Sequence, residues 1–130
     1  MAASRDRVWR DFTDSTAVAE WIWPTRFATT AVTEPVPMGA WEVRSDVVGI
    51  AVIGRVLAID APRQLRLAWR WDGDEHTSDV EITLKPAADG ATRVSVRHTG
   101  FQTAQEREEH VEGWSDCLQR LVERYSSPPR

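Results

Sequence analysis

Three histidines, one cysteine and several pairs of acidic residues are the side chains of this sequence that could take part in chemistry. His76, His98 and His110 are not spaced as metal ligands, and Cys117 stands alone, so we predict no metal site and no cofactor. The acidic pairs fall in a turn and at a helix start, where a surface role is the default. The sequence has no nucleophile elbow, phosphate-binding glycine loop or zinc-protease helix motif. No catalytic residue can be named from it.

Two of the histidines lie where a binding site could form. His98 alternates in phase with Val94 and Val96, so it is expected on an apolar face, near the mouth of any cavity. There it could fix a polar ligand group, or be a buried neutral imidazole bonded to a backbone carbonyl. His110 precedes Trp114 by four residues, on one side of a helix, and could face His98 across that mouth.

Tryptophan is abundant, and indole rings suit a pocket for a hydrophobic or aromatic ligand. They could equally fill that pocket and leave a solid core. Gly113 costs its helix about 1 kcal/mol relative to alanine. Either close approach of the helix to a sheet or room for a ligand would explain that cost. The candidate ligand-binding residues are Trp41, Trp69, Trp71, His98, His110 and Trp114.

The elements that must position these side chains begin with two short helices. Ser4 is a plausible N-cap for a helix over residues 5–12, whose apolar side chains follow helical spacing. Asp14 and Ser15 offer a second cap, and Pro24 ends the helix that follows. The apolar period then changes from 3.6 to 2 residues, which predicts strands. The predicted strands cover residues 27–33, 39–47, 50–60, 64–71, 77–85 and 91–100.

The connections between these strands are short and rich in turn residues, so we predict an antiparallel meander. Alternation gives the sheet one dry and one wet face, with Leu65, Leu67, Trp69 and Trp71 together on the dry one. A bulge or bend is expected around Gly54. Residues 103–125 return to helical spacing and predict a long helix that covers the dry face. Residues 126–130 are expected to fray.

Composition limits the classes of protein that remain. The chain has 130 residues, 42% hydrophobic and 28% charged, which fits one domain over residues 1–130 and excludes a multidomain enzyme. A net charge of -4 without long runs of like charge argues against a nucleic-acid binder or a basic membrane-surface protein. No stretch is long enough to span a membrane, and the start lacks a secretion signal. We therefore expect a cytoplasmic protein.

Short motifs spread along the chain resemble those of one family. The matching motifs, in chain order, are Val8-Trp9-Arg10, Phe12-Thr13-Asp14, Trp21-Ile22-Trp23-Pro24, Gly39-Ala40-Trp41, Gly54-Arg55-Val56, Ala61-Pro62-Arg63-Gln64-Leu65, Trp69, Thr92-Arg93-Val94, His98-Thr99-Gly100-Phe101 and His110 with Gly113-Trp114. Together they resemble the heat-shock protein 90 ATPase activator homologue family, which belongs to the START-like (SRPBCC) superfamily. Ala40 stands where that family usually has a second glycine, and Ser15 where a proline is common.

The resemblance implies an α+β helix-grip fold, like that of the birch pollen allergen, in which a curved antiparallel sheet wraps a long C-terminal helix around an apolar cavity. Similar proteins begin with a strand that pairs with the last one, and only residues 1–3 precede the first cap here. We expect that strand to be missing, which leaves strand 91–100 as an open edge. An upstream start, another chain or the chain's own terminus could cover it, and a homodimer through this edge is one expectation.

Three hypotheses for function remain open. The first is non-catalytic binding of a small hydrophobic molecule, such as a lipid, between the sheet and the long helix. The second, implied by the family's name, is a protein-interaction module that stimulates a chaperone ATPase and acts in the stress response. The third is an enzyme of cyclase or dehydratase type, because related members of the superfamily use such cavities for catalysis. We expect neither a nucleic-acid partner nor a membrane span.

Overall fold

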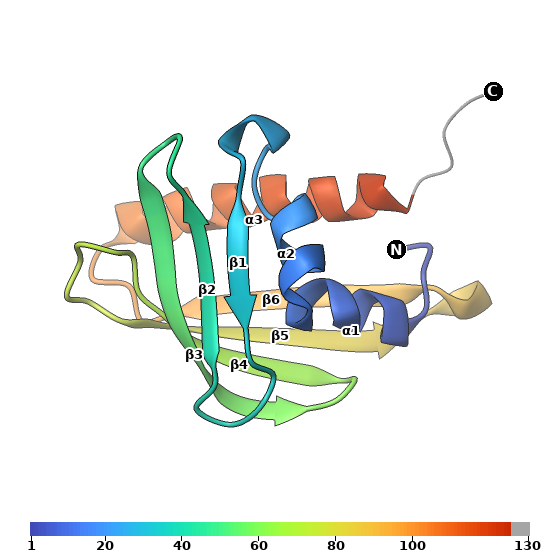
Figure 1. Cartoon of the computed structure of the whole chain (residues 1–130). Helices are drawn as coiled ribbons and strands as arrows, with labels where there is room; N and C mark the ends of the chain where they lie inside the picture. Colours follow the sequence, from blue (N-terminus) through green and yellow to red (C-terminus); the bar gives the residue numbers. More distant parts are fainter. Residues whose placement is uncertain (126–130) are drawn as a thin grey trace.

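Two helices open the fold, six strands follow, and one long helix closes it (Figure 1). The computed structural model describes residues 1–125. The α-helices are α1 (Arg5–Thr13), α2 (Ser15–Trp21) and α3 (Ala104–Arg124), and the short 3-10 helices are η1 (Thr25–Phe27) and η2 (Ala88–Gly90). The strands are β1 (Thr30–Thr33), β2 (Ala40–Ser45), β3 (Ile50–Asp60), β4 (Gln64–Trp69), β5 (Ser78–Pro86) and β6 (Thr92–Thr99). The prediction made for residues 126–130 lies outside the described part.

Polar caps fix where the helices begin. The side chain of Ser4 accepts from the backbone N–H of Arg7, and that of Asp14 accepts from the N–H of Ala17. Thr103 caps α3 in the same way. Each cap satisfies an N–H group that has no partner inside its own helix. The two short helices and the long one therefore start where the sequence predicts.

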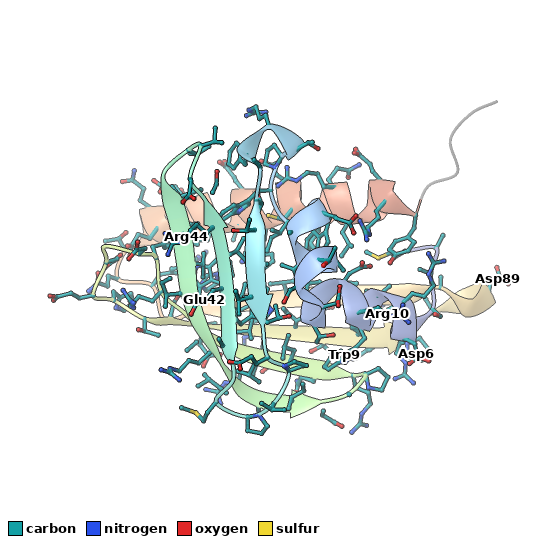
Figure 2. All side chains as sticks on the ribbon, viewed as in Figure 1. Asp6, Trp9, Arg10, Glu42, Arg44 and Asp89 are labelled. Atoms are coloured by element: carbon teal, nitrogen blue, oxygen red, sulfur yellow. The ribbon has the colours of Figure 1, made fainter. Side chains whose placement is uncertain are left out.

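The six strands form one antiparallel sheet in the order β1-β2-β3-β4-β5-β6, which confirms the meander. Along β2, Trp41 and Val43 are buried, whereas Glu42 and Arg44 lie on the opposite face (Figure 2). Strands β4 and β5 alternate in the same way, with buried apolar residues on one side. Helix α3 packs across this dry face, and α1 and α2 cover its other end (Figure 1). The fold class is the predicted α+β helix grip.

Three details differ from the prediction. The first strand begins at Thr30 rather than residue 27, because residues 25–27 form η1 and Ala28, at φ +48°, turns the chain out of it. Strand β4 ends at Trp69, and Trp71 makes only an isolated bridge to Val52. The register shift in β3 lies between residues 56 and 58 and not at Gly54.

Gly54 has a different role from the predicted bulge. A side chain there would come within 2.6 Å of the Ala68 carbonyl oxygen and 2.7 Å of the Trp41 carbonyl oxygen. These oxygens belong to the strands on either side of β3. Only glycine allows such a close approach of neighbouring backbones at this point.

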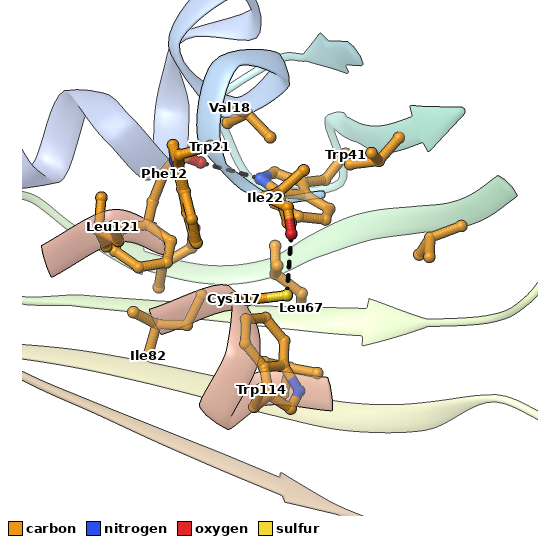
Figure 3. Close-up of a cluster of buried hydrophobic side chains, with 14 of the residues drawn as sticks. Phe12, Val18, Trp21, Ile22, Trp41, Leu67, Ile82, Trp114, Cys117 and Leu121 are labelled. Carbon is orange, nitrogen blue, oxygen red and sulfur yellow. Dashed lines mark hydrogen bonds between the residues drawn. The ribbon is translucent and has the colours of Figure 1, made fainter. Parts of the chain in front are cut away.

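The core lies between the dry face of the sheet and all three α-helices (Figure 3). Phe12 and Trp21 meet edge to face with ring centroids 5.1 Å apart, and Leu121 of α3 is fully buried beside them. The indole N–H of Trp41 donates to the Phe12 carbonyl, which ties β2 to α1. No helix in the described part is both long and apolar enough to cross a membrane.

The first residues of the chain lie against the start of β6. The amino group of Met1 donates to the Thr92 carbonyl at 3.0 Å, and the Thr92 N–H donates back to the Met1 carbonyl at 2.9 Å. The Thr92 hydroxyl also donates to the Ala3 carbonyl. The chain's own N-terminus, one of the three ways in which this edge could be covered, therefore pairs with the first residue of β6. Within residues 1–125, no strand lies beyond β6 in the sheet.

Candidate functional site

A pocket of about 510 Å³ lies between α3, η1 and the end of β4. Trp23 and Phe27, in the segment that follows α2, form one wall, and the side of α3 with Gly113 forms the other. Trp69 and Trp71 lie between the two walls. This volume falls within the usual range for small-molecule sites, about 300–1,000 Å³. A gap between the sheet and the terminal helix is therefore present, with the η1 segment as a third side.

Gly113 leaves part of this pocket open. A Cβ atom at this position would meet no heavy atom within 4 Å, apart from its own helical neighbours. The glycine therefore does not serve a close approach of helix to sheet, and that explanation is wrong. The remaining explanation is that the missing side chain leaves space over the pocket.

Four tryptophans give the pocket a continuous aromatic surface. Trp23 stacks on Trp71 with centroids 6.3 Å apart and an angle of 8° between their planes. Trp71 meets Trp69 edge to face at 5.8 Å, and Trp114 of α3 lies 5.3 Å from Trp69. Such offset and edge contacts are favoured by the charge distribution of aromatic rings. Because the rings support one another, their positions are set before any ligand arrives.

His110 holds the ring of Trp71. The Trp71 indole N–H donates to His110 Nε2 at 2.9 Å, and His110 Nδ1 lies 2.7 Å from the Glu106 carbonyl oxygen. A carbonyl only accepts, so Nδ1 carries the proton and Nε2 is bare. The imidazole is therefore neutral in this arrangement, with both of its nitrogens engaged.

His98 holds the ring of Trp114 in the same manner, but the roles of its two ring nitrogens are the reverse of those in His110. The Trp114 indole N–H donates to His98 Nδ1 at 3.0 Å, and His98 Nε2 lies 2.6 Å from the Ser78 hydroxyl. That hydroxyl donates to the Trp69 carbonyl, so it accepts from Nε2–H. Burial, and after it the neighbouring His110, lowers the pKa of His98 from 6.5 to about 3, and Asp79 opposes the shift. His98 is thus also a neutral imidazole.

The remaining indole nitrogen of the pocket floor faces neither solvent nor a partner. Trp69 Nε1 is buried and makes no hydrogen bond within residues 1–125. Trp41, Trp71 and Trp114 surround this ring with centroid distances between 5.3 and 5.8 Å. The floor therefore offers ring surface, and not the N–H groups of Trp69, Trp71 and Trp114, to a molecule in the pocket.

Cys117 and Arg120 join α3 to the end of α2. The Cys117 thiol lies 2.9 Å from the Ile22 carbonyl oxygen (Figure 3), and the Arg120 guanidinium donates to the carbonyls of Trp21 and Ile22. These carbonyls have lost their helical partners at the C-terminus of α2. Burial raises the pKa of the Cys117 thiol to about 11 despite the nearby Arg120. This cysteine is a structural residue and a poor nucleophile.

Charged side chains lie only around the rim of the pocket. The exposed residues Glu109 and Asp116 project from α3, and Arg26 lies over the ring of Phe27, 5.3 Å from its centroid. The half-buried Arg120 also lines the pocket. None of these four groups takes part in an ion pair found among residues 1–125. Polar ends of a bound molecule could meet charges of either sign here.

This arrangement is better suited to binding than to acid–base chemistry. His98 is a weak base, because its pKa is about 3, and both of its nitrogens are engaged. Ser78 and Cys117 lack a strong neighbouring base, which an activated nucleophile needs. Within the described residues, no group of three or more histidine, cysteine or acidic side chains is placed to hold a metal ion.

The structure places the six sequence-predicted residues in two groups. Trp69, Trp71, His110 and Trp114 line the pocket. His98 lies behind it, with its ring centroid 4.9 Å from that of His110 and 5.4 Å from that of Trp69. Trp41 does not line the pocket: its indole N–H donates to the Phe12 carbonyl of α1, and its ring packs against Trp69.

Sequence reasoning missed the wall formed by Trp23, Pro24, Arg26 and Phe27. The sequence pattern predicts only that Pro24 ends the second helix and that a strand begins at Phe27. One signal was available in the sequence: aromatic residues, Trp23 and Phe27, lie on each side of the helix-breaking Pro24. Nothing in that pattern specified which part of α3 it would face.

Comparisons with known proteins bear on the family and the fold of this chain. A family model described as "Activator of Hsp90 ATPase homolog 1-like protein" matches residues 2–125. Protein CV1439 from Chromobacterium violaceum is 27% identical, with a TM-score of 0.81 over 98% of this chain and 93% of its own. No curated protein matches the sequence.

Two further solved structures share the fold at lower identity. The AHSA1 protein SPO3351 from Silicibacter pomeroyi is 20% identical, with a TM-score of 0.75 over 95% of this chain and 91% of its own. PFC0360w from Plasmodium falciparum, an HSP90 activator, is 15% identical, with a TM-score of 0.74 over 92% of this chain and 86% of its own. At these identities the likeness is one of fold alone.

Proposed function

The chain belongs to the Activator of Hsp90 ATPase homolog 1-like family, and we propose that it binds a small hydrophobic molecule between the sheet and α3. The observation that carries the proposal is a pocket of about 510 Å³ whose floor is aromatic and whose floor N–H groups are already engaged or buried. Gly113 also lines the pocket and contributes no side chain to it, and a Cβ atom there would meet no heavy atom within 4 Å.

The chemistry of the lining favours a flat ligand that is apolar along its middle. Indole faces gain from contact with an aromatic or hydrocarbon surface, and each Å² of apolar area removed from water contributes about 25 cal/mol. A polar group at the centre of the ligand would lose its water and find no free partner on the floor. Polar groups at its ends would lie near the charged rim.

Titration with N-phenyl-1-naphthylamine, an uncharged aromatic probe, tests this proposal. Because its fluorescence rises in apolar surroundings, a saturable increase at pH 8 with one site per chain is expected. Quenching of tryptophan fluorescence should follow the same curve. A linear, non-saturating response from a protein with a normal circular dichroism spectrum would refute the proposed binding function.

Activation of a chaperone ATPase is the second candidate, favoured by the family's description and by the HSP90 activator among the similar structures. The chain would then act as a protein-interaction module of the stress response. A chaperone of that class, assayed for ATP hydrolysis with and without the chain, decides the question. A rate that stays unchanged at saturating concentrations of the chain would remove this candidate. A cytoplasmic location remains a prediction from the sequence.

A homodimer through the edge of β6 is a separate proposal about association. The backbone N–H and C=O of Thr92 point away from β5, toward Met1. Because these groups alternate sides along a strand, those of Val94, Val96 and His98 also point away from β5. A second copy could pair antiparallel with these groups. Pairing Val96 with its counterpart would place Arg97 opposite Ser95 and so avoid an arginine–arginine contact.

A further inference from the structure

The aromatic floor of the pocket depends on two indole–imidazole hydrogen bonds whose imidazole rings lie in contact. Trp71 donates to His110, Trp114 donates to His98, and the two imidazole rings lie 4.9 Å apart at an angle of 76°. Phe101 packs against both imidazoles, with ring centroids 4.5 and 4.7 Å away. Strand β6 and helix α3 are therefore joined at the pocket by this cluster of His98, His110, Trp71, Trp114 and Phe101.

Each histidine can play this part only without a second proton. A proton on His110 would go to Nε2, and a proton on His98 would go to Nδ1, because the other nitrogen of each ring already carries one. Both sites point at an indole N–H, which is a donor and cannot accept. Protonation would thus set two donors against each other and break the contact that holds Trp71 or Trp114.

We propose that His98 and His110 are the positioning residues of the binding site: as neutral imidazoles of opposite tautomer they hold Trp114 and Trp71 in its floor, so that the site opens and loses its ligand in acid. This inference rests on the proposed binding function and adds its regulation by pH. The two histidines act through the indoles and do not themselves need to touch the ligand.

Each element that packs against His98 and His110 carries charged or titratable groups. Strand β5 supplies Asp79, whose carboxylate is paired with Arg66 on the wet face of the sheet. The loop before β5 supplies His76, which bonds to the Gly100 carbonyl. Helix α3 supplies Glu106 and Glu109, whose carboxylates bond to the backbone N–H of Gln102 and to the side chain of Gln105. The polar contacts found for these carboxylates lead away from the two imidazoles.

The sign and size of the effect follow from the pKa of His98. The pKa of His98 is about 3 while its ring is buried in the closed site, and it would return to about 6.5 once the ring is released to water. Because its pKa is lowered, His98 stabilises the closed form in full above pH 6.5. This stabilisation is lost as the pH falls from 6.5 toward 3. At pH 5 the ratio of closed to open forms is reduced about thirtyfold, which sets the largest loss of affinity from His98 alone.

The test is the affinity for N-phenyl-1-naphthylamine between pH 8 and pH 5, a range in which this probe does not change its charge. The wild-type chain should bind more weakly toward pH 5, by up to about thirtyfold, while its far-ultraviolet circular dichroism stays constant. His98→Asn and His110→Gln each keep an acceptor oxygen near the position of the bare nitrogen but do not titrate. The affinity of each variant at pH 8 serves as its own reference, and the double variant should have a flat pH profile relative to that value.

His110→Phe is the matched control, because it keeps an aromatic ring and removes the acceptor. It should weaken binding at pH 8, and His110→Gln should restore it. A double variant with the same pH profile as the wild type, or equal affinities for His110→Phe and His110→Gln, would overturn the positioning role. Absence of saturable binding by the wild type at pH 8 would instead refute the underlying binding function.

Discussion

Replacement of Gly113 by leucine should stabilise the protein and remove its binding site, whereas replacement by alanine should stabilise it and leave the site almost intact. The position lies in the middle of α3, beside the pocket, with nothing within 4 Å of an added Cβ atom. Either residue therefore removes the cost of a helical glycine without a clash. Only leucine extends a branched side chain over the indole floor.

The expected magnitudes come from helix propensity and burial. Alanine in place of glycine gains about 1 kcal/mol in the free energy of unfolding, or roughly 3–5 °C in Tm for a domain of this size. Leucine gains a similar amount from propensity, and partial burial against the rings adds about 1 kcal/mol. Affinity for N-phenyl-1-naphthylamine should fall at least about tenfold for Gly113→Leu, which is about 1.4 kcal/mol, and by less than about threefold for Gly113→Ala.

Thermal unfolding and fluorescence titration of the two variants measure both quantities side by side. The leucine variant should be the more stable protein and the poorer binder, a combination that general damage to the fold cannot produce. Full affinity in Gly113→Leu would show that the probe does not occupy the space next to α3. A lower Tm in Gly113→Ala would show that position 113 is not open.

Other parts of the fold give predictions that do not depend on a ligand. Because burial raises the pKa of Cys117 to about 11, its thiol should react with Ellman's reagent at pH 8 at least about a hundredfold more slowly than the same thiol in urea; equal rates would contradict its burial. Tyr125→Phe should lower the free energy of unfolding by about 1–3 kcal/mol in denaturant titrations, because the buried carboxylate of Asp11 loses the hydroxyl that donates to it; no measurable loss would show that this bond contributes nothing. Val96→Pro should convert a dimer into a monomer in sedimentation experiments, because proline breaks edge pairing; a wild-type chain that stays monomeric at high concentration would remove the dimer proposal.

Much of the site could be predicted because it follows local periodicity. Strand alternation put Trp69 on the dry face, and helical spacing put His110 and Trp114 on one side of α3. Both patterns reflect fixed backbone geometry, with two residues per strand repeat and about 3.6 per helical turn. The structure places these three residues at the pocket for that reason.

What could not be predicted depends on contacts between distant segments. Trp41 is buried like the pocket tryptophans, but its indole N–H is bonded to the Phe12 carbonyl of α1 and its side chain does not line the pocket. The wall with Trp23 and Phe27 follows from how the η1 segment settles against α3, which no local pattern specifies. The tautomer of His98 is fixed by Ser78 and Trp114, 20 and 16 residues away in the sequence. His110 combines a local partner, the Glu106 carbonyl, with Trp71, which lies 39 residues away.

The proposed function requires that a small hydrophobic molecule bind against the indoles between the sheet and α3. Nitrogen-15 labelling of the seven tryptophan side chains provides a separate NMR signal for each indole N–H, and the claim is tested by titrating N-phenyl-1-naphthylamine at pH 8. The account predicts saturable shifts for Trp23, Trp71 and Trp114, with Trp9 and Trp21 almost unchanged. Shifts at Trp9 and Trp21 alone, or none at any indole, would contradict it.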